Sequence, residues 1–418
     1  MKLVKAINKL SYVLGELPVI QRIAQPIWCT LTSWLPLDLT YSDSTLWISL
    51  ELTSRWNLRC VYCGKSNSDE GKRLYDFSDE WLAPVMKELN RRGLWLVVAS
   101  SIGESTTRKG WQEICRSLHD AGLCLTIISN FARPLNPEEV DVLTNFSSIQ
   151  VSIDTANPQL FARIRRGANL ETVLMNIERV QARAESKGIP QPEFRFDTVI
   201  TDKTILGIED LVRLGLTHGI TDFYFANLCK GKDIEGDFNV YNAATLPKTE
   251  LTEGLACLER AIELVKQAGC KVDCNSGLLD SIKAKLNETI PNQEMPGHSP
   301  EGMSWGAPGV QEGMTRDCAE PWKYAQLCAH GEVRPCCAIN YAVGDLRTEP
   351  LEEILNGPKV RQFRQNLLSG HLEGTLCMHC SMQPQIPVRE FRRRMSGRLV
   401  LWSLRRRALN LFHAIAPA

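Results

Sequence analysis

Between residues 46 and 228, short apolar runs alternate with helix-length amphipathic stretches. The apolar runs are 46–53, 94–100, 123–129, 148–154, 194–200 and 222–228. The amphipathic stretches are 79–91, 108–121, 136–144, 170–187 and 206–218. This alternation is typical of repeated β–α units that build a parallel sheet. Six strands predict a partial (β/α)6 TIM-like barrel of the α/β class, because a complete barrel needs eight.

The rest of the chain divides by composition. A helical stretch near 246–268 precedes a Gly/Pro/Asn-rich passage at 289–313, and a cysteine-rich region follows. The final stretch, from Arg389, carries eight arginines against one glutamate, interleaved with apolar residues. We therefore expect an apolar N-terminal segment, a barrel, a helical extension with a linker, a small cysteine-rich domain and a basic amphipathic tail, at 1–45, 46–230, 231–313, 314–384 and 385–418.

Charge and cysteine content limit the function classes. Lysine plus arginine and aspartate plus glutamate number 48 each, so the net charge gives no indication of a nucleic-acid partner. The chain has 15 cysteines and no start that resembles a signal peptide. A cytoplasmic location is expected, where clustered cysteines indicate metal binding or catalysis rather than disulfides. No apolar run is long enough to cross a bilayer.

Two cysteines spaced as CxxC, Cys60 and Cys63, follow the first predicted strand in "LELTSRWNLRCVYCGKS". The loop after a strand's carboxyl end is where ligands bind in such a sheet. Two thiolates at this spacing can reach one metal centre, and they suit zinc, iron–sulfur or redox chemistry alike. Taken alone, the pair leaves these alternatives open.

The surrounding motifs resemble the radical S-adenosylmethionine (radical SAM) family. "WNLRCVYCG" is similar to that family's CNLRCxYC loop except at the first cysteine, where this chain has Trp56. "ASSIGES" (99–105) resembles its Gly-Gly-Glu loop, and "SIDTANPQLFARIRRGANLETVLMNI" (152–177) resembles its fourth strand and following helix. The resemblance covers roughly residues 46–228.

The resemblance implies S-adenosylmethionine as a cofactor and a [4Fe–4S] cluster at Cys60 and Cys63. It places Gly103 and Glu104 at the methionine end of S-adenosylmethionine. The polar residues that follow the third and fourth strands are expected near the ribose or the carboxylate of the cofactor: Ser129, Asn130, Ser152 and Asp154. Ordinary turn chemistry is the alternative for Ser129 and Asn130, and helix capping is the alternative for Asp154.

Trp56 leaves only two local thiolates where the family has three, and tryptophan offers no lone pair suited to iron. Three alternatives follow. A third ligand comes from Ser54, Ser66, Asp69 or an exogenous thiol; a labile or smaller cluster sits on Cys60 and Cys63; or the cluster is lost and the barrel is a binding module.

A second cysteine group resembles the SPASM type of C-terminal extension, which holds an auxiliary [4Fe–4S] cluster. The matching stretches are "CAEPWKYAQLCAHGEVRPCCAINYAVGDL" (318–346) and "LEEILNGPKVRQFRQNLLSGHLEGTLCMHC" (351–380). The resemblance implies one auxiliary cluster with four ligands, Cys318, Cys336, Cys377 and Cys380. Cys337 is the alternate to Cys336, and a four-thiolate zinc site is the alternative to the cluster.

Together these resemblances imply an oxidoreductase or maturase of the radical SAM type. Such an enzyme generates a 5′-deoxyadenosyl radical and abstracts hydrogen from a peptide, sugar or carrier-linked substrate, with flavodoxin or ferredoxin as a reductant. No further catalytic residue is identified. The alternative is a binding module that keeps only its SPASM cluster. The basic tail is expected either to lie on an anionic membrane or to pack on the barrel as a solvated helix.

Overall fold

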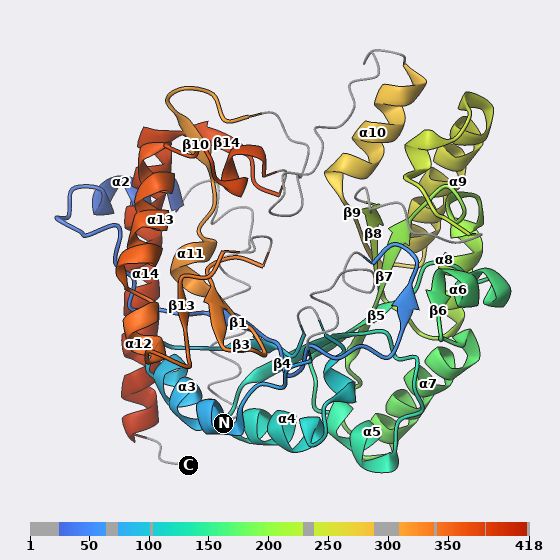
Figure 1. Ribbon diagram of the computed structural model, residues 1–418, viewed down its shortest axis with the longest axis horizontal. Coiled ribbons are helices and arrows are strands. Elements are labelled where there is room, and N and C mark those ends of the chain that lie inside the picture. The colour runs from blue at the N-terminus through green and yellow to red at the C-terminus, as the bar shows by residue number, and fades with distance from the viewer. Residues whose placement is uncertain are drawn as a thin grey trace.

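A ten-stranded sheet organises the computed structural model of this protein (Figure 1). The structure describes residues 25–63, 74–100, 103–228, 238–287, 309–337, 341–380 and 382–415. The strand order is β13-β12-β11-β1-β3-β4-β5-β7-β8-β9. From β11 to β9 in this order, neighbouring strands run parallel, whereas β12 and β13 are antiparallel additions at one edge.

The strands of the main sheet are β1 (Trp47–Leu50), β3 (Leu96–Val98), β4 (Cys124–Ser129), β5 (Ser148–Ser152), β7 (Glu193–Ile200), β8 (Asp222–Asn227), β9 (Lys271–Cys274), β11 (Tyr324–Leu327), β12 (Glu332–Arg334) and β13 (Gly344–Asp345). Two small antiparallel pairs join β2 (Arg59–Cys60) to β6 (Arg165–Arg166) and β10 (Met314–Arg316) to β14 (Gln385–Pro387).

The helices are α2 (Gln25–Thr32), α3 (Asp79–Arg91), α4 (Trp111–Asp120), α5 (Pro137–Leu143), α6 (Pro158–Ile164), α7 (Leu170–Ser186), α8 (Ile208–Thr217), α9 (Lys248–Gln267), α10 (Ser276–Leu286), α11 (Glu320–Lys323), α12 (Leu351–Ile354), α13 (Pro358–Ser369) and α14 (Val388–Ile415). Short 3₁₀ turns are η3 (Ser105–Thr107), η4 (Ile205–Gly207), η5 (Ala243–Thr245) and η6 (Leu376–His379). Among the described residues, no helix is both long and apolar enough to cross a membrane.

The strands bury alternate residues, which places the core on one side of the sheet. In β4, β5 and β7 every second residue is buried and the residues between are only half-buried. Helices α3, α4, α5 and α7 cover the outer side of the curved sheet in Figure 1. Because side chains alternate across a strand, the half-buried set faces the interior of the curve, where polar groups can meet a ligand.

These features confirm the expected α/β fold class, a partial barrel with a small cysteine-rich domain beside it. Helix α3 spans the predicted range 79–91, and all six predicted strands are present with bounds within a few residues. The parallel sheet is longer than the six strands predicted, because β9 and β11 extend it at opposite ends. Strand β9 (KVDC) has no buried residue, and β11 (YAQL) is a four-residue strand that contains a glutamine. Neither strand therefore shows the apolar run by which strands were predicted.

Candidate functional site

A cavity of about 330 Å³ lies at the carboxyl ends of the parallel strands. The predicted cofactor residues Gly103, Glu104, Ser129, Asn130 and Ser152 line it, together with Cys60 and Cys63. The other lining residues are Trp56, Leu58, Tyr62, Ser100, Ile128, Arg165, Asp197, Thr198, Val199, Tyr224 and Ala226. The structure thus brings together residues from six strands of the main sheet and from the loops that follow them. Asp154, also predicted, is not on the cavity wall.

Gly103 lets the loop after β3 approach the loop after β1. A Cβ atom at this position would lie 1.8 Å from the carbonyl oxygen of Thr53. The next backbone amide, that of Glu104, donates a hydrogen bond to the carbonyl oxygen of Arg55 at 2.8 Å. Only glycine permits this contact, which sets the distance between the two loops.

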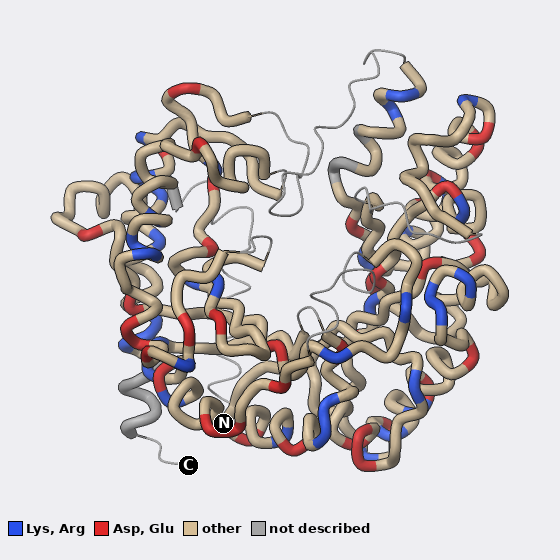
Figure 2. Tube along the Cα trace, viewed as in Figure 1, with Lys and Arg blue, Asp and Glu red and all other residues tan. Residues whose placement is uncertain are grey.

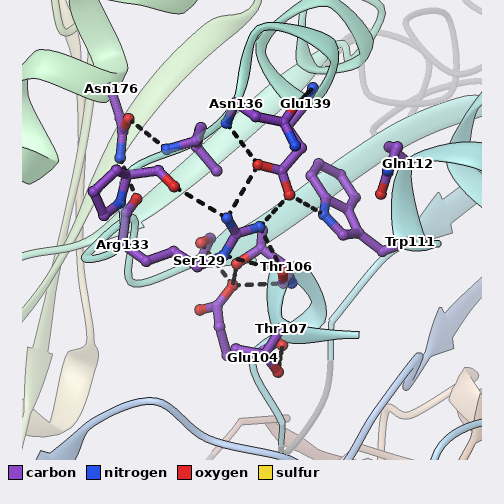
Figure 3. Close-up of polar contacts among 12 residues, drawn as sticks. Glu104, Thr106, Thr107, Trp111, Gln112, Ser129, Arg133, Asn136, Glu139 and Asn176 are labelled. Atoms are coloured by element: carbon purple, nitrogen blue, oxygen red, sulfur yellow. Dashed lines mark hydrogen bonds and ion pairs between the residues drawn. The ribbon is translucent and has the colours of Figure 1, made fainter. Parts of the chain in front are cut away.

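The Glu104 carboxylate ties the loops after β3 and β4 together (Figure 3). Its Oε1 accepts hydrogen bonds from Ser129 Oγ and Thr106 Oγ1, both at 2.8 Å, and from the Thr106 amide. Its Oε2 accepts from the Asn130 amide at 2.8 Å. The buried carboxylate is therefore solvated by protein donors on both of its oxygens, and it lines the cavity.

A second buried carboxylate, that of Glu139, extends this network behind the cavity (Figure 3). It accepts hydrogen bonds from Trp111 Nε1 at 2.9 Å and from the Asn136 amide at 2.8 Å, and it pairs with Arg133. Arg133 Nη2 also donates to the carbonyl oxygen of Thr106 at 2.6 Å. The carboxylates of Glu104 and Glu139 and the guanidinium of Arg133 thereby hold the loops behind the cavity in place.

Ser129 and Asn130 also serve the turn that follows β4. Ser129 Oγ accepts from the Phe131 amide at 3.1 Å, and Asn130 Oδ1 accepts from the Ala132 amide at 2.9 Å. Phe131 has φ 52°, a left-handed conformation that is uncommon for a bulky residue. Asn130 Nδ2 further donates to Asn57 Oδ1 at 2.8 Å, which links the turn to the CxxC loop.

Asp154 lies behind the cavity wall in a buried ion pair with Arg165. Its carboxylate accepts from Arg165 Nε at 2.8 Å and Nη2 at 3.0 Å, from the Tyr62 hydroxyl at 2.9 Å, and from the Val199 amide at 3.1 Å. Burial opposes the charge on Arg165, yet Asp154 holds its pKa above the usual value. Burial also raises the pKa of Tyr62. Asp154 therefore orients Arg165 and Tyr62, which themselves line the cavity.

The CxxC loop is fixed to this ion pair through the backbone. Cys60 of β2 pairs with Arg165 of β6, and the Val61 amide donates to the Ile164 carbonyl at 2.9 Å. Cys60 is buried, and burial raises the pKa of its thiol to about 11. Cys63 follows one turn later and is half-buried on the same cavity. A bound cation would favour the thiolate forms of both.

Trp56 faces the same cavity from between two anchored neighbours. The Arg55 carbonyl is held by the Glu104 amide and the Asn57 side chain by Asn130, so the position of Trp56 is well defined. Its side chain is 38% exposed. The described residues therefore supply two thiols, one fewer than a cluster held by three protein cysteines requires, and they do not fit such a cluster.

Of the other ligand residues proposed from the sequence, Ser54 alone lies in the part of the chain that the structure describes. Ser54 is buried, is not among the residues that line the cavity, and its Oγ accepts from the Tyr75 amide at 2.8 Å. Ser66 and Asp69 lie outside the described residues.

Asp197 and Tyr224 line the cavity from β7 and β8, and Arg195 contacts both of them from outside the lining. Arg195 Nε pairs with Asp197 Oδ1 at 2.5 Å, and Arg195 Nη2 donates to Gln150 Oε1 at 2.7 Å. The Arg195 guanidinium also lies over the Tyr224 ring, 5.3 Å from its centroid. Burial raises the pKa of Asp197, and Arg195 opposes this effect.

The second cysteine group gathers in a separate apolar core. Cys318, Cys336 and Cys377 pack with a cluster whose buried residues are Trp322, Phe363, Leu367, Leu368, Leu372, Phe391 and Met395. Burial raises the pKa of Cys377 to about 12, with the nearby Cys380 adding to the effect. Burial also raises the pKa of Cys318, and Cys377 and Cys380 add to it. Neighbouring thiols thus oppose ionisation of Cys318 and Cys377, and a bound cationic centre would favour their thiolate forms.

The donor set of this group fits an iron–sulfur cluster. Four thiols from three segments, Cys318, Cys336, Cys377 and Cys380, are the soft ligands that such clusters and zinc prefer, and none of the four forms a disulfide. Cys336 packs in the core, whereas Cys337 is exposed to solvent. This difference favours Cys336 as the fourth ligand.

A third group, Cys328, His330 and Glu332, has ligand atoms within 4.8 Å of one another. Arg334 Nη2 already lies 2.8 Å from Glu332 Oε2, and His330 Nε2 lies 3.0 Å from the same oxygen. The negative charge of this turn is thus balanced by protein cations, and we assign no metal to it.

Comparison with known families accounts for both sites. Residues 50–189 match the radical SAM superfamily, and residues 318–381 match SPASM, an iron–sulfur cluster-binding domain. The chain therefore contains a segment that matches the radical SAM superfamily, followed by a segment that matches SPASM. Domains of these two kinds imply [4Fe–4S] clusters and S-adenosylmethionine as cofactors.

Curated relatives match between 31% and 44% of this chain. A GTP 3′,8-cyclase from Peptoclostridium acidaminophilum is 29% identical over 34% of this chain and 44% of its own length. An S-adenosylmethionine-dependent nucleotide dehydratase from Selenomonas ruminantium is 26% identical over 40% of this chain and 63% of its own length. The match to the cyclase thus spans less than half of that relative.

Solved structures share the fold. SuiB from Streptococcus suis bound to S-adenosylmethionine aligns with a TM-score of 0.50 at 14% identity, covering 77% of this chain and 65% of that one. The structure of anSMEcpe with AdoMet and the Cp18Cys peptide aligns with a TM-score of 0.51 at 17% identity, covering 81% of this chain and 89% of that one.

Sequence reasoning missed several residues of the cavity. Tyr62, inside the CxxC, and Arg165, in "FARIRRG", were quoted only as parts of motifs. Arg195 and Asp197 alternate with phenylalanines in "FRFDTVI". Charges at every second position of an apolar strand indicate one polar face, and this signal could have placed both residues inside the barrel.

The contact beneath Gly103 makes a direct prediction. Gly103→Ala should push the two loops apart, lower the free energy of unfolding by about 1–3 kcal/mol and weaken S-adenosylmethionine binding. Urea unfolding and calorimetric titration measure the two effects. Gly207→Ala is the matched control, because a Cβ there meets no atom within 4 Å. Equal unfolding free energies and equal affinities for S-adenosylmethionine in the two variants would contradict the role assigned to Gly103.

The buried ion pair makes a second prediction. Asp154→Asn should leave the Arg165 guanidinium buried without its counter-charge and cost about 3–5 kcal/mol in unfolding free energy. Glu138→Gln breaks the exposed pair with Arg116, at 3.2 Å, and should cost no more than about 1 kcal/mol. Urea unfolding of both variants measures their free energies of unfolding. If Asp154→Asn loses no more unfolding free energy than Glu138→Gln, the Asp154–Arg165 pair does not stabilise the fold as proposed.

Proposed function

We propose that this protein is a radical SAM enzyme that modifies a peptide, sugar or carrier-linked substrate by hydrogen abstraction. The observation that carries the proposal is the cavity that Cys60 and Cys63 share with Gly103 at the carboxyl ends of the strands. Radical SAM enzymes use a reduced [4Fe–4S] cluster to cleave S-adenosylmethionine into methionine and a 5′-deoxyadenosyl radical. The auxiliary cluster belongs to the SPASM cysteines.

This chain's own residues would bind and orient the cofactor. Arg165, held by Asp154, presents a fixed positive charge to the cavity, suited to the carboxylate of S-adenosylmethionine. Oε2 of Glu104 can accept a hydrogen bond from an ammonium group. The apolar wall of Leu58, Ile128 and Val199 would exclude water from a reactive radical.

The Asp197 carboxylate, which lines the cavity and is held by Arg195, is suited to a substrate rich in amide or hydroxyl groups. A peptide is favoured among the three substrate classes, because SuiB has been solved with its precursor peptide SuiA and anSMEcpe with Cp18Cys. Because a GTP 3′,8-cyclase is among the curated relatives, a nucleotide is the alternative substrate for this protein. A flavodoxin or ferredoxin is the proposed electron donor.

A second candidate function rests on Trp56. An indole facing the cavity at the position of the first cysteine favours a binding module, in which the barrel holds a ligand and only the SPASM cluster remains. In the enzyme, by contrast, a ligand from outside the Cys60–Cys63 pair must complete the cluster.

Iron and sulfide analysis with electron paramagnetic resonance distinguishes the two candidates. For the enzyme, we expect about eight irons per chain, falling to about four in Cys60→Ala and likewise in Cys377→Ala. Dithionite-reduced wild type should release 5′-deoxyadenosine, and Cys60→Ala should not.

The binding module makes the opposite prediction for the same samples. Wild type would hold about four irons, unchanged by Cys60→Ala and lost in Cys377→Ala. Trp56→Cys would then add a cluster whose signal responds to S-adenosylmethionine. Such a signal, present in Trp56→Cys and missing in wild type, would refute the enzyme proposal. Cys115→Ala, at a buried thiol outside both groups, is the matched control.

A further inference from the structure

Helix α2 is seated on the C-terminal helix α14 by a close contact. A Cβ atom on Gly397 would lie 2.5 Å from Cys29 Sγ, so the helices approach to backbone distance. Trp28 Nε1 donates to the Gly397 carbonyl at 3.0 Å, and Arg393 Nη1 donates to Thr30 Oγ1 at 2.8 Å. Figure 1 shows α2 on the side of α14 that faces away from the main sheet.

The opposite face of α2 is apolar and open to solvent. Ile27 and Leu31, one helical turn apart, are 59% and 66% exposed. Trp34, in the turn that ends the helix, is 85% exposed, and Leu35 beside it is also exposed. An indole this exposed is unusual, and contiguous exposed apolar residues mark binding surfaces rather than ordinary solvent-facing ones.

Helix α14 continues this apolar face. Leu401 and Leu404 are both at least half exposed. They follow Gly397 by four and seven residues, so helical periodicity places them on the side of α14 that carries α2. We call this set the α2/α14 surface: Ile27, Leu31, Trp34, Leu35, Leu401 and Leu404.

The charges around the α2/α14 surface are almost entirely positive. The sequence from Gln25 to Leu37 contains no charged residue, and α14 brings eight arginines against Glu390. Hydrogen bonds from Arg393, joined by Arg394, lower the pKa of Glu390 to about 2, so this acid is already neutralised by its own helix.

The remaining acids near α14 are also engaged. Asp317 pairs with Arg394 and Arg398, and Asp43 pairs with Arg406. Arg389, Arg392 and Arg407 are exposed. Figure 2 shows basic positions recurring along α14 at the left of the molecule. Positive charge therefore remains in excess beside the apolar side chains.

We propose that the α2/α14 surface docks on an anionic lipid bilayer. Trp34 and the leucines would enter the headgroup region, and the exposed arginines would lie against lipid phosphates. An apolar face with basic charge in excess around it, where the nearby acids Glu390, Asp317, Asp43 and Asp38 are each paired with arginine, suits such a bilayer better than a protein partner that brings both signs of charge. The surface is distinct from the barrel cavity, so this inference stands apart from the proposed function.

Vesicle sedimentation of the full-length protein tests the proposal. We expect binding to phosphatidylcholine vesicles that contain 30% phosphatidylglycerol and much weaker binding to phosphatidylcholine alone. Leu31→Glu/Trp34→Glu should lower the partition coefficient at least about tenfold, because the apolar contribution is lost and negative charge is added. Arg407→Glu should lower it about tenfold through charge alone.

Leu206→Glu is the matched control and should bind as wild type does. Leu206 is an exposed leucine in η4, beside α8 and α9 on the far side of the molecule from α2. A second double variant, Leu401→Glu/Leu404→Glu, tests the α14 half separately, and retained SPASM iron with unchanged circular dichroism shows that each variant is folded.

Two results would overturn the proposal. One is equal binding by wild type and both double variants, or no binding to either vesicle. The other is a dimer of wild type in light scattering that Leu31→Glu/Trp34→Glu converts to monomer, which would make this face a contact between protein copies.

Discussion

The parallel pairing of β1 with β11 determines how the two cysteine sites stand relative to each other. Four residues of each strand are in register, from Trp47 opposite Tyr324 to Leu50 opposite Leu327. Strand β1 leads into the loop that carries Trp56, Cys60 and Cys63, while β11 lies between Cys318 and Cys336. The Glu51 carboxylate reinforces the junction by accepting a hydrogen bond from the Ala329 amide at 2.9 Å. The SPASM domain is therefore joined to the barrel by a hydrogen-bonded ladder, which holds both sites on one rigid sheet.

The residues that line the cavity also hold the barrel together. Gly103 permits two loops to touch, Glu104 joins the turns after β3 and β4, and Asp154 solvates a buried guanidinium. These contacts support the fold of the barrel, whatever the residues do in the proposed binding of a cofactor. Gly103, Glu104 and Asp154 would be needed for these structural contacts even in a chain with Trp56 and no cluster at Cys60 and Cys63. Their presence therefore does not distinguish an enzyme from a binding module, and iron content and cofactor cleavage are the properties that do.

Charge is segregated in a chain whose net charge is zero. Acidic and basic residues pair on the outer helices, whereas the interior of the barrel carries two ion pairs beside the cavity, Arg195–Asp197 and Arg165–Asp154. The C-terminal helix concentrates arginines that outnumber their carboxylate partners. A buried pair is costly to break and orients its members, while an exposed excess of one sign favours a partner of the other sign.

The sequence by itself determined the barrel elements and the motifs. The six predicted strands and helices such as α3 follow from local periodicity, and the cysteine spacing indicated two metal sites. Tertiary structure decided what local patterns do not encode. Strand β11 exists because it pairs with a strand some 270 residues earlier in the chain. Asp154 proved to hold Arg165 and Tyr62 behind the cavity wall, since a carboxylate's partners depend on which loops the fold brings together. The direction of Trp56 into the cavity was likewise fixed by contacts of its neighbours with Glu104 and Asn130, residues of distant loops.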